Sequence, residues 1–208
     1  MGHIIVTGGR GLIGSALTAV LVADNHEVII LSRNPSKASN LPTGARAIAW
    51  DVRTANGWGS LADGALAIVN LAGATIARPP WTAAHKRRIR ASRVHAGRAV
   101  VEAVTAAKQK PGVVIQASGV GYYGLHDDDL VTEETPAGKD FLASVCLDWE
   151  ASTAEVEALG VRRVIIRTGL ALSNKGGILP LMVLPFRFCV GGPIGSGKQY
   201  WPWIHIAD

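Results

Sequence analysis

The sequence predicts a doubly wound α/β domain, in which helices cover both faces of a parallel β-sheet. Three observations lead to this prediction. Short, near-continuous apolar runs alternate with segments of helical periodicity, a glycine-rich turn follows the first run, and 48% of the 208 residues are apolar while 18% are charged. Parallel strands need long crossover connections, which helices provide. The composition also excludes a disordered chain, a collagen and a coiled coil.

The elements are expected in a regular order along the chain. Apolar and β-branched runs predict six strands, at residues 3–7, 27–31, 46–50, 65–71, 113–117 and 162–168. Helical spacing predicts a first helix from about residue 12 to residue 21 and a long helix at about 82–110, which Pro111 closes. A further helix is expected at about 141–159, with Gly160 as its stop.

The net charge and the cysteines limit the binding partners and the cellular compartment that the sequence predicts. The net charge of +5 suits nucleic acid and a small polyanionic cofactor equally. Cys146 and Cys189 each lie in apolar sequence and are expected to be buried thiols of a reducing compartment. No uncharged stretch reaches the roughly 18 residues of a membrane span, and we recognise no N-terminal targeting segment. These features predict a soluble, cytoplasmic protein with no membrane partner.

The glycine-rich turn carries the strongest functional signal. Residues 7–14, TGGRGLIG, stand between the first strand and the first helix. We expect Gly8 to permit the sharp turn, Gly11 to let the backbone approach a pyrophosphate, and Gly14 to allow close packing of the helix. Three glycines could form only a turn and a packing contact, but the strand–turn–helix context predicts a dinucleotide site. Its expected contacts are Gly8, Gly9, Arg10, Gly11, Leu12, Ile13 and Gly14.

The end of the second strand indicates which dinucleotide the site prefers. An NAD site places an acidic residue there to accept from the ribose 2′-hydroxyl, whereas an NADP site offers arginine to the 2′-phosphate. This chain has Ser32 and Arg33 and no acid at that point. Arg33 could be an ordinary surface residue, yet the missing carboxylate favours NADP, with Arg33 and Ser32 donating to the 2′-phosphate.

The turn and several later segments resemble one family. The spacing of TGGRGLIG is similar to the TGxxGxxG of extended short-chain dehydrogenases/reductases of the nucleoside-diphosphate-sugar epimerase type. The chain is identified as a member of the epimerase group that includes the human class 39U reductase and its bacterial relatives. The segments that carry this resemblance span essentially the whole chain and include HEVIILSRNP, IVNLAGATIA, RASR, SGVGYYG, VTEETP, RTGLAL, LPFRF and GGPIGSGKQYWPWIHIAD.

The resemblance implies further cofactor contacts. Asp51, after the third strand, would lie near the adenine, and Arg93 in the long helix would face the cofactor, although basic runs of this kind more often form a solvated helix face. The loop after the fourth strand would skirt the cofactor ribose and phosphates, and the segment after the sixth strand would border the nicotinamide. These loops contain Leu71, Ala72 and Gly73, and Gly169 and Ala171.

Two parts of the chain are expected on the same basis. Residues 1–172 would form an NADP-binding Rossmann domain, and residues 173–208, rich in glycine and proline, would begin a substrate lobe. One short strand is predicted there, at residues 200–206. Because members of the family continue past the WIHIAD segment, and the doubly wound fold lacks a closing element, we expect this lobe to be incomplete.

The reaction centre departs from the family pattern. Typical extended reductases use a Tyr-x-x-x-Lys pair, in which the lysine lowers the tyrosine pKa, but no tyrosine here has a lysine four residues later. Ser118, Tyr122 and Tyr123, in the SGVGYYG segment, are the remaining candidates for catalysis. The segment could also be a glycine-rich turn whose tyrosines only pack. We predict no metal site, because the acidic run after His126 is typical of a solvated loop.

Two functions from different classes fit these observations. The first is an NADP-dependent oxidoreductase or epimerase acting on a hydroxyl or carbonyl of a small polar metabolite. The second is a non-catalytic NADP-binding or redox-sensing protein that has lost the Tyr/Lys chemistry. Nucleic-acid binding through the basic helix is disfavoured, because no reader motif or interleaved aromatic residues accompany it. A homodimer is compatible with the sequence.

Overall fold

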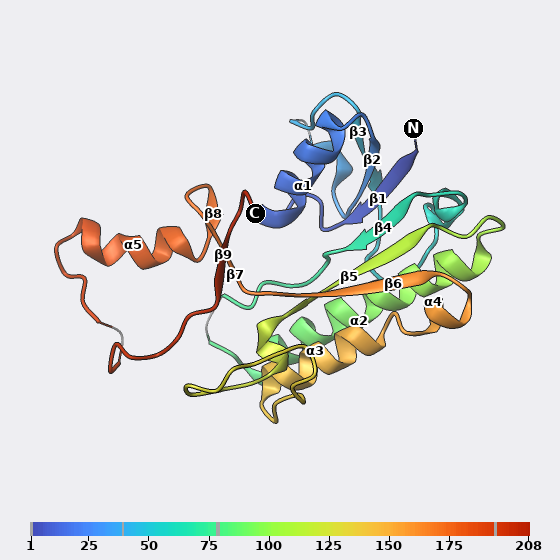
Figure 1. The fold of residues 1–208 in the computed structure, drawn as a ribbon. Helices are drawn as coiled ribbons and strands as arrows, with labels where there is room; N and C mark the ends of the chain where they lie inside the picture. Colours follow the sequence, from blue (N-terminus) through green and yellow to red (C-terminus); the bar gives the residue numbers. More distant parts are fainter. Residues whose placement is uncertain (1, 39, 78–79, 194) are drawn as a thin grey trace.

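The computed structural model describes residues 2–38, 40–77, 80–193 and 195–208. Its centre is a six-stranded sheet with strand order β3-β2-β1-β4-β5-β6, and every neighbouring pair is parallel (Figure 1). The strands are β1 (His3–Thr7), β2 (Glu27–Ser32), β3 (Ala45–Ala49), β4 (Ala67–Asn70), β5 (Val113–Gly119) and β6 (Arg162–Thr168). The doubly wound parallel fold predicted from the sequence is therefore confirmed.

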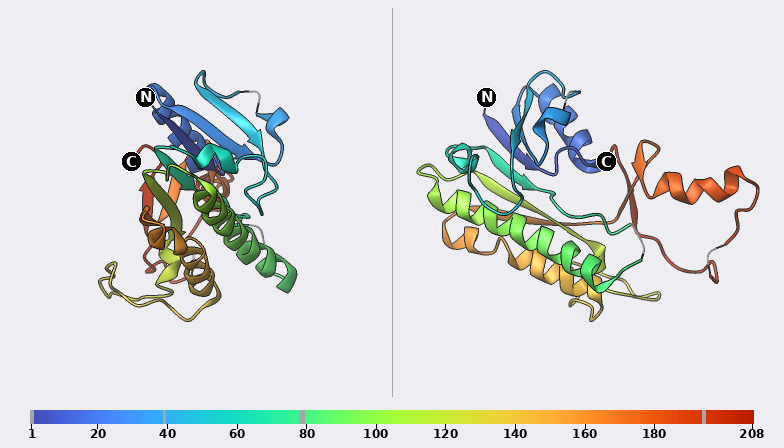
Figure 2. Two further views of the ribbon diagram at one scale, coloured as in Figure 1. Left: turned by 90° about the vertical axis from the view of Figure 1, so that its right-hand side faces the viewer. Right: turned by 180° about the vertical axis from the view of Figure 1, so that it is seen from behind.

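Helices cover both faces of this sheet, as Figure 2 shows. On one face, α1 (Leu12–Ala23) packs Leu17 and Leu21 against buried residues of β1 and β2. On the other face, α2 (Ala83–Ala106) buries Val100 and Val104 in the larger core cluster. Two further helices, α3 (Phe141–Ala151) and α4 (Glu155–Ala158), lie beside α2 (Figure 1). Because both faces are covered, the central strands are apolar on both sides.

The strand order reverses direction between β1 and β4. The chain runs from β1 outward to β2 and β3, then returns to β4 on the other side of β1. All six strands are parallel, so their carboxyl ends meet at the same edge. In open α/β sheets, ligands bind outside these carboxyl ends at the point where the strand order reverses. The loops after β1 and β4 meet at that point.

The helix predicted at about 141–159 is wrong in one respect, because the structure divides it into α3 and α4. The backbone carbonyl of Glu150, which would accept from a continuing helix, instead accepts from Arg163 Nη1 at 2.7 Å. Ser152 Oγ donates back to the carbonyl of Trp149 at 2.6 Å. Such side-chain bonds to the backbone compete with helix continuation. A residue of β6 therefore helps to end α3, which local periodicity could not indicate.

The C-terminal part forms a second, smaller sheet with order β8-β7-β9. It comprises β7 (Leu170–Ser173), β8 (Gly176–Gly177) and β9 (Trp203–His205), and α5 (Leu179–Arg187) projects away from the main sheet (Figure 1). The predicted strand at 200–206 is confirmed only at residues 203–205. Cys189 is exposed, so its predicted burial is wrong, whereas Cys146 is buried as expected. The division of the chain after residue 172 stays a prediction.

Among the residues that the structure describes there are also three short 3-10 helices, namely η1 (Pro35–Lys37), η2 (Gly59–Ala62) and η3 (Val120–Tyr122). None of the helices in the described part of the chain has the length and apolar character needed to cross a membrane.

Candidate functional site

The glycine turn brings the first crossover against the loop after β4. Gly8 has φ +69°, a left-handed conformation that glycine adopts without strain. A Cβ at Gly8 would lie 2.9 Å from the carbonyl oxygen of Leu71, and a Cβ at Gly14 would lie 2.6 Å from Gly9 Cα. Gly11 caps α1 without a side-chain hydrogen bond. The turn thus presents bare backbone at a helix N-terminus, which suits an anionic group.

Cationic side chains gather beside the end of β2. Ser32 is buried and its Oγ accepts from the backbone N–H of Asn34 at 3.2 Å, which fixes the loop that begins there. Arg33 is exposed. Arg10, from the glycine turn, donates to the carbonyls of Asn34 at 3.2 Å and Lys37 at 2.9 Å. The predicted residues Arg10, Ser32 and Arg33 are therefore brought to one corner of the site.

Asp51, the residue expected near the adenine, is engaged by its own turn. Its Oδ1 accepts from the backbone N–H groups of Arg53 and Thr54, at 2.8 and 2.9 Å, and its Oδ2 accepts from Thr54 Oγ1 at 2.9 Å. These bonds, led by the one from the Thr54 backbone, hold the pKa of Asp51 below its ordinary value. Since three donors already face the carboxylate, its main structural effect is to order the loop after β3.

The loop after β4 is clamped by two adjacent side chains of α2. Ser92 Oγ accepts from the backbone N–H of Ala74 at 2.9 Å, and Arg93 Nη1 donates to the Ala74 carbonyl at 3.0 Å. Gly73 lies directly against the Arg93 guanidinium, because a Cβ at Gly73 would be 2.9 Å from Arg93 Cζ. The segment that contains Leu71, Ala72 and Gly73 is thereby held at the carboxyl edge of the sheet.

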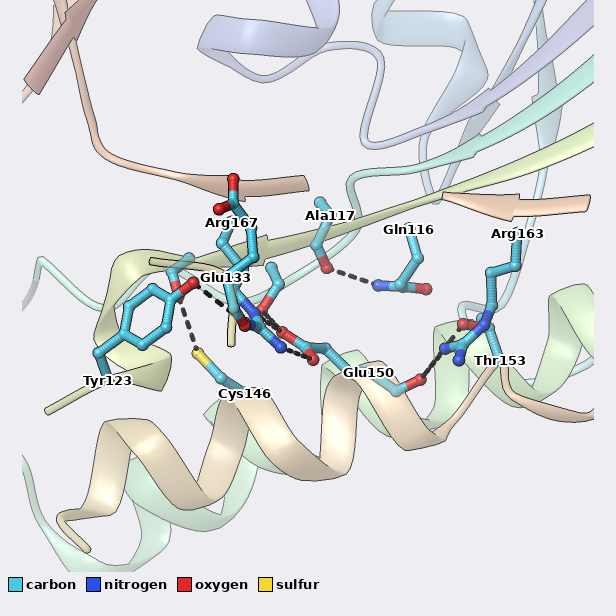
Figure 3. A network of polar contacts seen from close by, with 11 residues as sticks. Gln116, Ala117, Tyr123, Glu133, Cys146, Glu150, Thr153, Arg163 and Arg167 are labelled. Carbon is cyan, nitrogen blue, oxygen red and sulfur yellow. Dashed lines mark hydrogen bonds and ion pairs between the residues drawn. The ribbon is translucent and has the colours of Figure 1, made fainter. Parts of the chain in front are cut away.

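A buried polar network connects β5, α3 and β6, as Figure 3 shows. Ser118 Oγ donates to Glu150 Oε1 at 2.6 Å. Arg167 binds both carboxylate oxygens of Glu150, at 2.9 and 3.0 Å, and donates to Tyr123 Oη at 3.0 Å. The Glu150 carboxylate in turn raises the pKa of the Arg167 guanidinium. The Tyr122 ring lies 3.5 Å from Arg167 Cζ, so one arginine holds both tyrosines.

This network shows what the candidate reaction residues can do chemically. The Ser118 hydroxyl donates a hydrogen bond to Glu150, and its oxygen lone pairs can accept from a further donor. Tyr123 accepts from Arg167 and so retains its own hydroxyl proton to donate. Ser118, Tyr122 and Tyr123 are thus brought together, while their contacts with a substrate stay a prediction. Glu150 and Arg167 were missed from the sequence, because Glu150 of α3 and Arg167 of β6 come together only in the folded structure.

Three residues of α3 spaced four apart, Leu142, Cys146 and Glu150, face the loop that contains Ser118 and Gly121. A Cβ at Gly121 would lie 3.4 Å from Leu142 Cβ, Cys146 Sγ lies 3.8 Å from the carbonyl oxygen of Gly119, and Glu150 binds Ser118. The tyrosine and lysine of a Tyr-x-x-x-Lys pair are also four residues apart, so such a pair could lie on this face of the helix. In this chain the first two of the three positions hold Leu142 and Cys146 instead. Burial raises the pKa of the Cys146 thiol, which therefore stays protonated and neutral at physiological pH.

The remaining predicted residues lie at the edges of the site. Gly169 follows β6, and a Cβ there would lie 2.9 Å from the carbonyl oxygen of Pro202. Ala171 lies in β7, paired with Ile204 of β9. The acidic residues after His126 are exposed, and within the described ranges no group of three His, Cys, Asp or Glu side chains could hold a metal.

Comparisons with known proteins agree with this geometry. The NAD dependent epimerase/dehydratase family model matches residues 4–208. The chain is 38% identical to human epimerase family protein SDR39U1 over 99% of its own length and 67% of the human protein. It is 36% identical to the chloroplastic homolog of SDR39U1 from Arabidopsis thaliana, of which it spans 59%.

Two solved structures share the fold at substantial identity. The crystal structure of human SDR39U1 with NADPH superposes with a TM-score of 0.84 and 35% identity, covering 99% of this chain and 66% of the human one. A nucleoside-diphosphate sugar epimerase from Corynebacterium glutamicum gives a TM-score of 0.80 and 40% identity, covering 100% of this chain and 41% of that one. Its glycine turn, its sheet order and a family match over nearly all of its own residues show that the chain belongs to the NAD dependent epimerase/dehydratase family.

Proposed function

We propose that this chain binds NADP(H) at the carboxyl edge of its sheet. The observation that carries the proposal is the corner after β2, where Ser32 and Arg33 stand in place of an acid and Arg10 adds a second guanidinium. Arginine binds phosphate oxygens through paired N–H groups, whereas a carboxylate would repel the 2′-phosphate. The NADPH in the crystal structure of human SDR39U1 supports the choice.

The other residues at this edge fit the rest of a dinucleotide. The backbone of the glycine turn and the N-terminus of α1 would receive the pyrophosphate, because Gly8, Gly11 and Gly14 leave no side chain in the way. The loop of Leu71, Ala72 and Gly73 would lie along the ribose and phosphates, and Gly169 and Ala171 would border the nicotinamide. Asp51 would lie towards the adenine.

We infer an oxidoreductase or epimerase reaction at a hydroxyl or carbonyl of a small polar metabolite. When bound, the nicotinamide accepts or supplies a hydride. Tyr123 keeps a proton to donate to a substrate oxygen, and the lone pairs of Ser118 can accept from a substrate hydroxyl. Arg167 and Glu150 hold these groups in place. A cytoplasmic location and a homodimer are part of this proposal.

A non-catalytic NADP-binding or redox-sensing function is the second candidate. It is favoured by the α3 face that approaches the loop of Ser118, where Leu142 and Cys146 replace polar groups. Single-turnover oxidation of NADPH with a panel of aldehydes, ketones and sugar nucleotides separates the two functions. Oxidation that falls about 100-fold or more in Tyr123→Phe supports catalysis, since this is the usual effect of a lost general acid. NADPH that binds but is never oxidised favours the second function.

Cofactor choice is tested by replacing Arg33. Arg33→Ala should weaken NADPH binding by about 2 kcal/mol, roughly 30-fold, because it removes a charge-assisted contact to the 2′-phosphate. NADH, which lacks that phosphate, should bind the variant and the parent equally. Fluorescence titration of both cofactors measures the difference, with Arg98→Ala, an exposed substitution on α2, as the control. Equal losses for NADPH and NADH would contradict the assignment.

A further inference from the structure

The segment that contains α5 and β9 exposes many large apolar side chains. Phe186, Phe188 and Val190, at the end of α5 and just beyond it, are 62%, 70% and 75% exposed, and Tyr200 and Trp203 are 74% and 64% exposed. Single apolar residues on a surface are ordinary, but a group of them in one projecting segment indicates an interaction surface. We call residues 179–193 and 195–205 the apolar lobe (Figure 1).

The only charged side chains of the apolar lobe are positive. Arg187 and Lys198 are exposed, and the sequence has no Asp or Glu between Glu157 and Asp208. Neither cation forms an ion pair within the described ranges. A complementary partner for this surface therefore presents exposed apolar side chains together with negative charge.

The same chain presents a surface of that kind in the loop between η3 and α3, residues 124–138, which we call the acidic loop. Leu125 and Leu130 are 98% and 90% exposed. The loop contains no Lys or Arg, and its carboxylates form no ion pair among the residues that the structure describes. These exposed acids are Asp127, Asp128, Asp129, Glu133 and Glu134.

The acidic loop is held at its base, although its leucines are exposed. The backbone N–H of Gly138 donates to the carbonyl of Tyr122 at 2.9 Å, which closes the loop. Arg167 Nη1 donates to the carbonyl of Glu133 at 3.1 Å, which fixes the loop against β6. A loop that is ordered before it binds loses less conformational entropy on binding, so this surface is suited to docking.

The acidic loop and the apolar lobe both extend from the carboxyl edge of the main sheet, as the views in Figures 1 and 2 agree. No ion pair joins them in the part of the chain that the structure describes. Each copy of the chain therefore carries two complementary surfaces on one side. A twofold axis between two copies would pair both loops with both lobes at once.

We propose that the apolar lobe is covered by the acidic loop of a second copy of this chain. The leucines of that loop pack against the exposed aromatic side chains of the lobe, and its carboxylates face Arg187 and Lys198. This inference rests on the homodimer of the proposed function and deepens it, because it names the two surfaces that meet.

The experiment exchanges the charges of the two surfaces. The loop variant carries Asp127→Lys, Asp128→Lys and Asp129→Lys, and the lobe variant carries Arg187→Glu and Lys198→Glu. Each variant alone should dimerise at least about 100-fold more weakly than the parent, because like charges then face each other in both contacts. An equal mixture of the two variants should form a heterodimer, since every loop again meets a lobe of opposite charge.

Sedimentation velocity over a range of protein concentrations measures the dimer, and thermal unfolding monitored by circular dichroism verifies that each variant is folded. Arg87→Glu/Arg98→Glu, which reverses two exposed cations of α2 outside both surfaces, is the matched control and should dimerise like the parent. Where a charge-reversed variant does not fold, Leu125→Ser/Leu130→Ser tests the apolar part of the contact and should weaken the dimer by about 10-fold or more.

A parent that stays monomeric at every concentration would overturn the inference, and so would a mixture of folded variants that stays monomeric. A loop that closes onto the lobe of its own chain gives the second result, because mixing cannot restore a contact within one chain. NADPH titration of each variant keeps this test separate from the proposed cofactor site. NADPH should bind all of them like the parent, and a parent that binds no NADPH would contradict the cofactor proposal alone.

Discussion

At the scale of single residues, the pair of Glu150 and Arg167 determines how the candidate reaction loop is held. Both side chains are mostly buried, with exposures of 11% and 19%, and the ion pair is bidentate. Removing one member leaves the other charge buried without its partner, which is costly in proteins. Because Ser118 and Tyr123 depend on the same pair, the stability of this cluster and the geometry of the loop are linked.

Arg167→Leu should therefore destabilise the protein by about 3 kcal/mol, since it leaves the Glu150 carboxylate uncompensated. The double variant Glu150→Gln/Arg167→Leu should lose at least about 1 kcal/mol less than the sum of the two single variants, because they remove one shared interaction. Urea unfolding of the four proteins measures this coupling. Strictly additive losses would show that the two side chains do not act as a pair.

At the scale of elements, the turn between β1 and α1 distinguishes two kinds of glycine. A Cβ at Gly11 would meet only the carbonyl oxygen of Gly8, at 3.2 Å, whereas a Cβ at Gly14 would meet several backbone atoms of the turn, including Gly9 Cα at 2.6 Å. Gly11 is exposed and Gly14 is buried. The first glycine thus keeps space open on the ligand side, and the second lets α1 pack against the turn.

Gly14→Ala should destabilise the fold by about 1–3 kcal/mol, the usual cost of overpacking. Gly11→Val should leave the unfolding midpoint much closer to that of the parent but abolish NADPH binding, because the branched side chain stands where the pyrophosphate approaches. Thermal unfolding and calorimetric titration of the two variants provide the comparison. NADPH binding retained in Gly11→Val would place the ligand elsewhere.

The order of the elements could be predicted from the sequence because it depends on local periodicity. The bounds of β1 and β6 agree with the prediction, and the glycine turn lies where TGGRGLIG indicated. The network around Glu150 could not be predicted, since Ser118 and Arg167 become neighbours only through the pairing of β5 with β6. The end of α3 likewise depends on Arg163 from another strand.

At the scale of the whole molecule, the candidate site occupies one edge of the sheet and involves segments far apart in the sequence. Ser32, Ala72 and Ser118 lie at or just beyond the carboxyl ends of β2, β4 and β5. No single element contains the site, because it is the parallel pairing of the strands that brings their carboxyl ends to the same edge of the sheet. A ligand that spans both halves should therefore stabilise several separate segments at once and leave the amino edge of the sheet unchanged.

Hydrogen exchange gives the last prediction, because it reports each segment separately. At an NADPH concentration of 100 times Kd, amides that exchange only after the ligand leaves should slow by about 100-fold. We expect this protection in peptides that cover residues 8–13, 32–34 and 71–74, which line the carboxyl edge. Peptides that cover residues 24–27 and 158–162, at the amino edge, should exchange as in the free protein, and so should α5, which projects away from the sheet. NADH at the same concentration should protect residues 32–34 less, since it lacks the phosphate that Ser32 and Arg33 would bind. Protection spread evenly over both edges would indicate a general stabilisation rather than a ligand at this site.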